Sequence, residues 1–184
     1  GCGKSTIAHL LLRLVDPQAG AIRFGGVDVR KTATADLYKR IALMTQDAPV
    51  FLDTIRANLL IGRADAGDGE LWAVLDAVRL ASFVRELPQQ LDAVVGEAGR
   101  TLSAGQARRL CLARTLLSRA DVVVFDEPTS GLDRETESAF LADLPGLMGG
   151  RTAIVITHAD VPPGFDQVLT LRSGRLQQAH QAGE

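Results

Sequence analysis

The stretch VVVFDEP, residues 122–128, places two carboxylates directly after a run of four apolar residues. A short apolar run of this kind favours a buried strand, so Asp126 and Glu127 are expected where that strand ends. Similar apolar runs occupy residues 41–46 and 152–156, and segments with helical periodicity separate them. Such an alternation predicts an α/β fold with a mostly parallel sheet flanked by helices on both faces. Ligands of these sheets bind at the carboxyl ends of the strands, although two acids at a strand end can also be plain solvated loop residues.

The stretch GCGKST, residues 1–6, indicates what the ligand is. Its Gly3-Lys4-Ser5 supplies the last three letters of the phosphate-binding pattern G-x-x-x-x-G-K-[ST], which follows a buried strand and opens a helix. Gly1 and Gly3 let backbone N–H groups approach phosphate oxygens, Lys4 would reach the β- and γ-phosphates, and Ser5 would ligate Mg²⁺. The alternative is a glycine-rich cap of the helix predicted over residues 7–15. Because the pattern's first glycine and the strand before it are not in the sequence, we expect an N-terminally truncated fragment whose first strands are missing.

Composition excludes several other classes of protein. The 184 residues are 46% hydrophobic and 23% charged, which is typical of a soluble globular chain of one domain or slightly more. No apolar run approaches the ~18 residues of a membrane span. The net charge of −2 and the pI near 5.9 argue against a nucleic-acid partner. Cys2 and Cys111 form no metal-ligand spacing and no disulfide framework, and Cys2 is either a reactive thiol or a spacer in the loop.

The distribution of the patterns predicts two structural parts. Residues 1–61 and 106–176 alternate strands with helices and would form the nucleotide-binding core, incomplete at its N-terminus. Residues 62–105 show no strand pattern, with one helical run over 71–87, and would form an inserted helical subdomain. A final strand pair is expected within residues 168–176, and residues 177–184 would form a flexible tail.

Four further motifs support the nucleotide site. The stretch TLSAGQARR, residues 101–109, resembles the signature LSGGQ of ATP-binding cassette (ABC) ATPases. Residues 130–133, SGLD, resemble their D-loop, residues 156–158, ITH, their H-loop, and residues 45–47, TQD, their Q-loop. Together with the GKS and DE motifs they follow the family's order over residues 1–158. The chain therefore resembles an ABC transporter nucleotide-binding domain, a P-loop NTPase with an inserted signature subdomain that binds ATP and Mg²⁺.

The resemblance implies a role for each matching residue. Glu127 would be the general base for water, His158 would stabilise the γ-phosphate, and Gln46 would sense the attacking water and the membrane domain. The implied Mg²⁺ ligands are Ser5, Gln46 and Asp126. The implied nucleotide-binding residues are Gly1, Cys2, Gly3, Lys4, Ser5 and Thr6, together with Leu102, Ser103, Ala104, Gly105, Gln106 and Asp133. Ser103 and Gly105 would act on ATP held by a partner domain, so two domains would associate head to tail with ATP between them. Ala104 departs from the family's glycine, which is harmless only where its φ is negative.

Variable positions suggest a subfamily. The Gly-Glu-x-Gly of residues 96–99 resembles the exporter loop that contacts the coupling helices of the membrane domains. The sequence of residues 95–117, together with TIRANLLIG at residues 54–62, looks most like that of the CydC-type subunit of the cysteine/glutathione exporter needed for cytochrome bd assembly. That subunit would pair with a CydD-type partner on the cytoplasmic face of the inner (plasma) membrane. The alternatives are a lipid or multidrug exporter half-transporter and a soluble ABC ATPase of DNA repair or translation, which the short Gln46–Leu102 spacing and the negative charge oppose.

Overall fold

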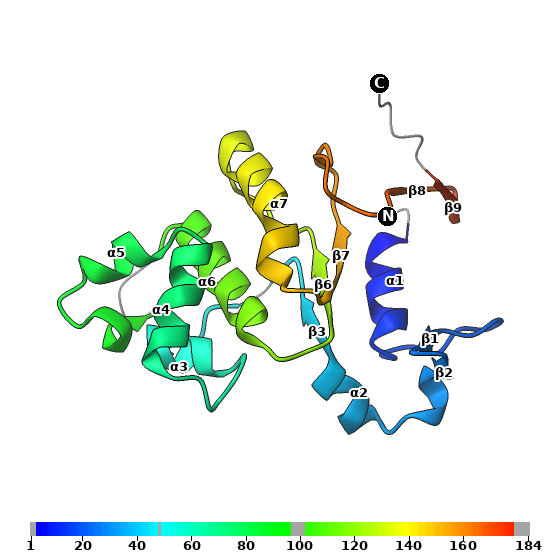
Figure 1. Cartoon of the computed structure of the whole chain (residues 1–184), viewed down its shortest axis with the longest axis horizontal. Helices are drawn as coiled ribbons and strands as arrows, with labels where there is room; N and C mark the ends of the chain where they lie inside the picture. The colour runs from blue at the N-terminus through cyan, green and yellow to red at the C-terminus, as the bar shows by residue number, and fades with distance from the viewer. Residues whose placement is uncertain (1–2, 48, 97–101, 179–184) are drawn as a thin grey trace.

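The computed structural model describes residues 3–47, 49–96 and 102–178 of the chain. Its main sheet has three parallel strands in the order β3-β6-β7, formed by Ile41–Met44, Val122–Asp126 and Thr152–Ile156. The register pairs Ile41 with Val122 and Asp126 with Ile156, so the carboxyl ends of these strands share one edge. Helices lie on both sides of the sheet (Figure 1), and the expected α/β architecture is confirmed.

The central strand β6 explains why the sequence shows an unbroken apolar run. Successive side chains of a strand point to opposite faces, and here both faces are covered. Val123 and Phe125 belong to the larger core, which includes α6 (Ala104–Leu117) and α7 (Arg134–Met148). Val124 belongs to the smaller core with α1 (Lys4–Leu11) and α2 (Thr34–Arg40). All three side chains are 0% exposed, and complete burial of such side chains contributes about 1.5–3 kcal/mol each.

The hairpin that follows α1 is closed by two glycines. Strands β1 (Arg23–Phe24) and β2 (Val27–Asp28) pair antiparallel, and φ is 55° at Gly25 and 82° at Gly26. Two consecutive positive φ values define the turn whose twist suits a two-residue hairpin, and glycine adopts them without a Cβ penalty. A tight turn therefore connects these two short strands.

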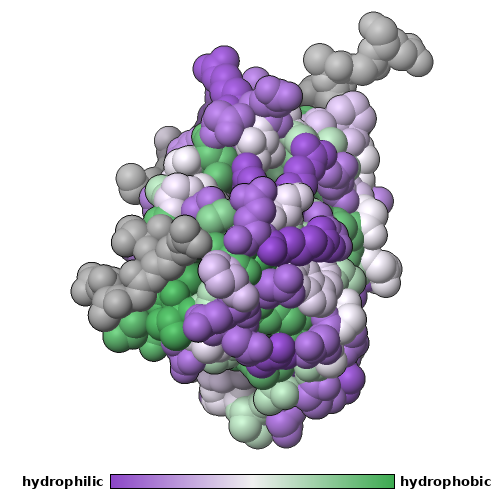
Figure 2. All heavy atoms as spheres, turned by 90° about the vertical axis from the view of Figure 1, so that its left-hand side faces the viewer, coloured by the Kyte–Doolittle hydropathy of each residue, from purple (hydrophilic) through white to green (hydrophobic). Residues whose placement is uncertain are grey.

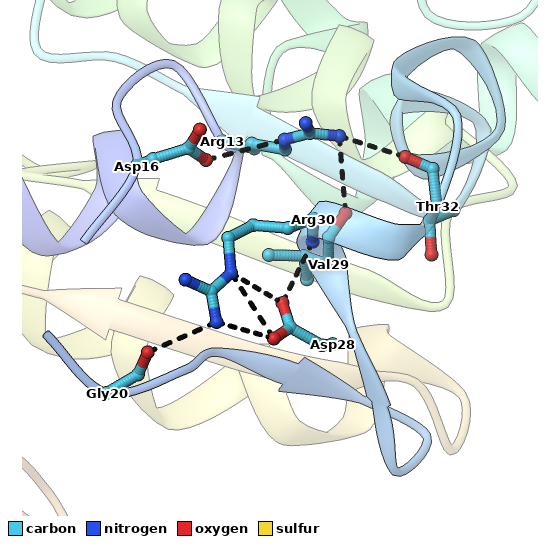
Figure 3. A network of polar contacts seen from close by, with 7 residues as sticks. All are labelled: Arg13, Asp16, Gly20, Asp28, Val29, Arg30 and Thr32. Atoms are coloured by element: carbon cyan, nitrogen blue, oxygen red, sulfur yellow. Dashed lines mark hydrogen bonds and ion pairs between the residues drawn. The ribbon is translucent and has the colours of Figure 1, made fainter. Parts of the chain in front are cut away.

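A polar network anchors this hairpin to α1 (Figure 3). Arg13 donates to the carbonyl oxygens of Val29 and Thr32, at 3.5 and 3.0 Å, from beyond the C-terminus of α1. Its φ of 53° helps to end the helix at Leu11, earlier than the residue 15 that the apolar pattern predicted. At η1 (Val29–Lys31), the guanidinium of Arg30 binds the Asp28 carboxylate at 2.7 Å. This hydrogen bond, together with one from the Arg30 N–H, lowers the pKa of Asp28 to about 2.

The segment between β3 and α6 differs from the prediction in two respects. Residues 62–105, for which no strand was predicted, contain β5 (Val94–Val95), which pairs antiparallel with β4 (Asp53–Thr54). The helical run predicted over residues 71–87 forms two helices, α4 (Asp68–Ala77) and α5 (Ala81–Arg85). Arg79 breaks the run because its φ is 56°, and the Leu80 N–H then bonds to the Leu75 carbonyl at 2.9 Å. Helices α3 (Ile55–Leu60) and α4 pack against α6, and η2 (Gln90–Asp92) precedes β5.

The described part of the chain ends in an antiparallel pair, β8 (Leu169–Arg172) and β9 (Arg175–Gln178). The expected final strand pair is present, but residues 177 and 178 belong to β9 and not to a tail. Within the described ranges, no helix combines the length and apolar character needed to cross a bilayer.

Candidate functional site

The N-terminus of α1 has the backbone geometry that phosphate binding requires. Gly3 is its N-cap with a φ of 96°, a left-handed conformation that glycine adopts most readily. Lys4, Ser5 and Thr6 form the first turn, where backbone N–H groups have no partner within the helix. Ser5 and Thr6 are exposed there. Gly1 and Cys2 lie outside the described residues.

Three elements converge at the carboxyl edge of the sheet. The Lys4 Nζ atom lies 3.0 Å from Glu127 Oε1 and 3.2 Å from the Thr157 carbonyl oxygen. The His158 Nε2 atom lies 3.2 Å from the same Glu127 Oε1. The side chains of Lys4 and Glu127 are 19% and 17% exposed, whereas that of His158 is 77% exposed. The structure thus brings together three of the expected site residues, at the N-terminus of α1 and directly after β6 and β7, although Lys4 is more than 120 positions from the other two.

The backbone of Glu127 is held in a conformation that non-glycine residues avoid. Its φ is 50°, and left-handed backbone costs such a residue about 1–2 kcal/mol. Its N–H donates to the Ile156 carbonyl at 2.8 Å, and its carbonyl accepts from the Ser130 N–H at 3.2 Å. These bonds hold the residue immediately after β6, where its carboxylate meets Lys4 and His158. Strained residues of this kind concentrate at functional sites.

Asp126 and Gln46 lie at the ends of neighbouring strands. Asp126 is the last residue of β6 and is 6% exposed, and Gln46 follows the end of β3 by two residues with an exposed side chain. The Arg108 guanidinium reaches the carbonyl oxygens of both residues, at 3.3 Å for Asp126 and 2.5 Å for Gln46. A buried arginine therefore joins the two loops that follow β3 and β6.

The signature motif forms the N-terminus of α6. Ser103 is the N-cap, and its Oγ accepts from the Gln106 N–H at 3.2 Å while the Gln106 Oε1 accepts from the Ser103 N–H at 2.9 Å. Ala104 is the first residue of α6, and its φ is not positive. Its methyl group therefore causes no backbone strain. Leu102 packs partly buried on the larger core, and a Cβ at Gly105 would lie 3.5 Å from Leu132. Among the described residues, no hydrogen bond of Ser103 or Gln106 reaches Lys4, Glu127 or His158.

Asp133 caps the next helix, α7. Its carboxylate accepts from the Thr136 N–H at 2.9 Å and from the Thr136 hydroxyl at 2.7 Å. These two hydrogen bonds lower the pKa of Asp133. The D-loop is therefore anchored at its last residue to the first turn of α7.

The donor set suits Mg²⁺ that is shared with phosphate. In the described part of the chain, no group of three or more His, Cys, Asp or Glu side chains could hold a metal ion. The expected ligands Ser5, Gln46 and Asp126 include a single carboxylate. Mg²⁺ in nucleotide sites is bound through one or two carboxylates plus phosphate oxygens, so this set fits the metal only together with a nucleotide.

Arg108 is not among the site residues that the sequence motifs predicted. A signal for it was available, because Arg108, Cys111, Leu112 and Thr115 recur at helical spacing and all are buried on α6. A charged residue in phase with a buried helix face needs polar partners inside the protein.

The fold and this site define a P-loop nucleotide-binding domain. Residues 1–130 match the family model described as ABC transporter, so the chain belongs to the ABC transporter family. It is 40% identical to the mitochondrial iron-sulfur clusters transporter ATM1 of Saccharomyces cerevisiae, covering 97% of this chain and 26% of that protein. It is 39% identical to the ATP-dependent lipid A-core flippase of Chromobacterium violaceum, covering 99% of this chain and 32% of that protein.

A solved structure of an ABC exporter is also similar to this chain. A bacterial Atm1-family ABC exporter with ATP bound matches with a TM-score of 0.85 and 37% identity, over 96% of this chain and 31% of that chain. The chain thus spans about a third or less of the length of the relatives described here. The expected family and P-loop fold are confirmed, and the similarity is to ABC exporters.

Proposed function

We propose that this chain is the ATP-binding and ATP-hydrolysing domain of an ABC exporter. The observation that carries the proposal is that Lys4, Glu127 and His158 converge at the carboxyl edge of a parallel sheet. The Lys4 Nζ atom and the His158 Nε2 atom lie 3.0 and 3.2 Å from the same oxygen, Glu127 Oε1. Bound MgATP would supply the phosphoanhydride bond that is broken. Ser5, Gln46 and Asp126 would hold the Mg²⁺, and the N–H groups from Gly3 to Thr6 would hold phosphate oxygens.

The ion pair between Lys4 and Glu127 indicates how the site would become active. Lys4 would exchange Glu127 for phosphate oxygens, and this exchange leaves Glu127 Oε1 available to accept a proton from water. A positioned general base contributes about 10²–10⁴ in rate. His158, beside the same oxygen, would stabilise charge on the γ-phosphate. Activation would therefore begin with the loss of one ion pair.

We propose that the signature motif contacts ATP that is bound to a second nucleotide-binding domain. Ser103, Ala104 and Gly105 stand at the N-terminus of the 14-residue helix α6, which favours an anion, and Ser103 and Ala104 are exposed. Two domains would then associate head to tail, with Leu102, Gln106 and Asp133 supporting the shared site. Residues 62–105 would serve as the helical part that carries this motif.

An apolar surface beside the Q-loop is proposed to contact the membrane domain. Phe51, Leu52 and Val94 are 48%, 59% and 44% exposed, and the pairing of β4 with β5 brings the segments that carry them together. The face formed by α3 to α5 is mostly hydrophilic with a hydrophobic area at its lower left (Figure 2). The coupling helices of the transmembrane domains are the proposed occupant. We propose that the chain lies on the cytoplasmic side of a membrane, in contact with these helices.

The relatives favour one of the earlier alternatives for the cargo. Their names specify iron-sulfur clusters and lipid A-core, which fit a half-transporter of the lipid or multidrug type better than the cysteine/glutathione exporter subunit. We therefore propose the half-transporter, with the CydC-type subunit and its CydD-type partner as the second candidate. Co-purification separates them, because only the second candidate requires a different partner subunit.

The test is Mg²⁺-dependent ATP turnover by the complete polypeptide. Lys4→Ala should remove ATP binding and turnover, because Lys4 would contact the phosphates. Lys39→Ala is the matched control, since Lys39 is an exposed lysine on α2 that pairs with Asp36 at 3.1 Å. Turnover that is absent in the unsubstituted protein, or equal in both variants, would contradict the proposal.

A further inference from the structure

Arg108 is the most completely bonded side chain near the site. It projects from the second turn of α6 and is 7% exposed. Within the described residues, its hydrogen bonds all end on backbone carbonyl oxygens. The acceptors are those of Pro128 at 2.8 Å, Thr45 at 3.2 Å, Gln46 at 2.5 Å, Asp126 at 3.3 Å and Glu127.

Such a cluster of acceptors suits a guanidinium and no other side chain. A guanidinium presents five N–H donors in a planar fork, whereas an ammonium presents three donors from one atom. Burial lowers the pKa of Arg108, and the carbonyl dipoles offset the cost of removing its charge from water. Replacement by lysine would therefore keep the charge but lose the simultaneous contact with two loops.

The carbonyl of Glu127 is the important acceptor. Glu127 has left-handed backbone, which persists only where its surroundings enforce it. Its carbonyl is bonded to Arg108 and to the Ser130 N–H. Without the guanidinium, the residue can relax toward the ordinary right-handed region, and its carboxylate then turns away from the position beside Lys4 and His158.

We propose that Arg108 is a positioning residue that fixes the backbone at Gln46 and at Glu127 as one unit. It acts through these two residues and not on the nucleotide. The proposed metal ligand Gln46 and the proposed base Glu127 therefore cannot shift independently of each other or of the signature helix. The inference rests on the ATPase function proposed above and adds a residue to the machinery of that site.

The test compares Arg108→Lys and Arg108→Gln in the complete polypeptide. We expect kcat for ATP to fall about tenfold to hundredfold, because a misplacement of about 1 Å costs on this scale. The Kd for ATP, measured with a fluorescent nucleotide, should stay within about twofold, because Lys4 and the α1 N-terminus are untouched. If the glutamine variant fails to fold, the lysine variant carries the test alone.

Arg151→Lys is the matched control. Arg151 also donates to carbonyl oxygens, those of Met148, Leu116 and Ser118 at 2.9, 3.2 and 2.8 Å, and burial lowers its pKa as well. It precedes β7, at the opposite end of that strand from His158. Its variant should melt at a lower temperature while keeping the kcat of the unsubstituted protein.

Three outcomes would overturn the inference. Arg108 variants that lose thermal stability but keep kcat would show a purely structural role. Variants in which the Kd for ATP weakens as much as kcat would place Arg108 in nucleotide binding instead. An unsubstituted protein without ATP turnover would overturn the proposed function, and this inference with it.

Discussion

Replacing Gly62 with alanine should separate two packed helices. A Cβ at Gly62 would lie 2.0 Å from the Arg114 carbonyl oxygen, 2.9 Å from the Arg114 carbonyl carbon and 3.2 Å from the Leu59 carbonyl oxygen. All three atoms are backbone atoms of α6 or α3, so no side chain can rotate away. The helices must therefore move apart by more than 1 Å to restore ordinary contact distances of about 3.4 Å.

This movement would open the larger core at Leu59, which is 0% exposed. Overpacking usually costs about 1–3 kcal/mol, and a clash with rigid backbone belongs at the upper end or beyond. For a domain of this size, 1 kcal/mol shifts the Tm by about 2–4 °C, so we expect a loss of about 6–12 °C. Differential scanning calorimetry of the complete polypeptide measures this loss.

Gly69→Ala provides the matched control. Gly69 lies in the first turn of α4, and a Cβ there would meet nothing within 4 Å. Alanine is favoured over glycine in helices by up to about 1 kcal/mol, so this variant should melt at or slightly above the Tm of the unsubstituted protein. If Gly62→Ala melts within 1 °C of Gly69→Ala, α3 does not pack on α6 as described.

Two further predictions concern the partner and the pH. Ser103→Arg should prevent ATP-dependent association, measured by light scattering, but should spare nucleotide binding by a single domain. Ser103→Thr, which keeps the N-cap hydroxyl, is the control. If a single Ser103→Arg domain loses nucleotide binding, Ser103 does not act on the ATP of a partner. Because Arg30 lowers the pKa of Asp28 to about 2, below its unfolded value near 3.8, this carboxylate stabilises the fold above about pH 4 and loses that effect as the pH falls through 2. Thermal melting from pH 6 to pH 2 should therefore show a smaller fall in Tm for Asp28→Asn, and an equal fall would argue against the Asp28–Arg30 pair.

The sequence predicts the centre of the fold because its signals are local. Strand β6 is apolar on both faces, and the glycine-lysine-serine motif and the acids are each contiguous in sequence. Their order along the chain is enough to place the ends of α1 and β6 at one edge of the sheet. The contact between Lys4 and Glu127 agrees with that expectation.

The features that the sequence does not predict depend on single backbone angles or distant partners. Arg79 splits one helical pattern into α4 and α5, although the apolar periodicity continues across the break. Strands β4 and β5 have two residues each, too few for an alternating pattern, and they lie about 40 positions apart. The left-handed backbone of Glu127 and the hydrogen bonds of Arg108 form only when the loops that follow β3 and β6 are both in place.

Glu127 is proposed to be the general base of an ATP-hydrolysing site. The most direct measurement is the steady-state turnover of ATP by the complete polypeptide carrying Glu127→Gln, with ATP-dependent association measured on the same sample. Glutamine keeps the size of the side chain but cannot accept the proton, so turnover should fall by about 10²–10⁴ while the ATP-dependent dimer persists. Turnover at the rate of the unsubstituted protein, in a variant that still binds ATP, would contradict the assignment of Glu127 as the general base.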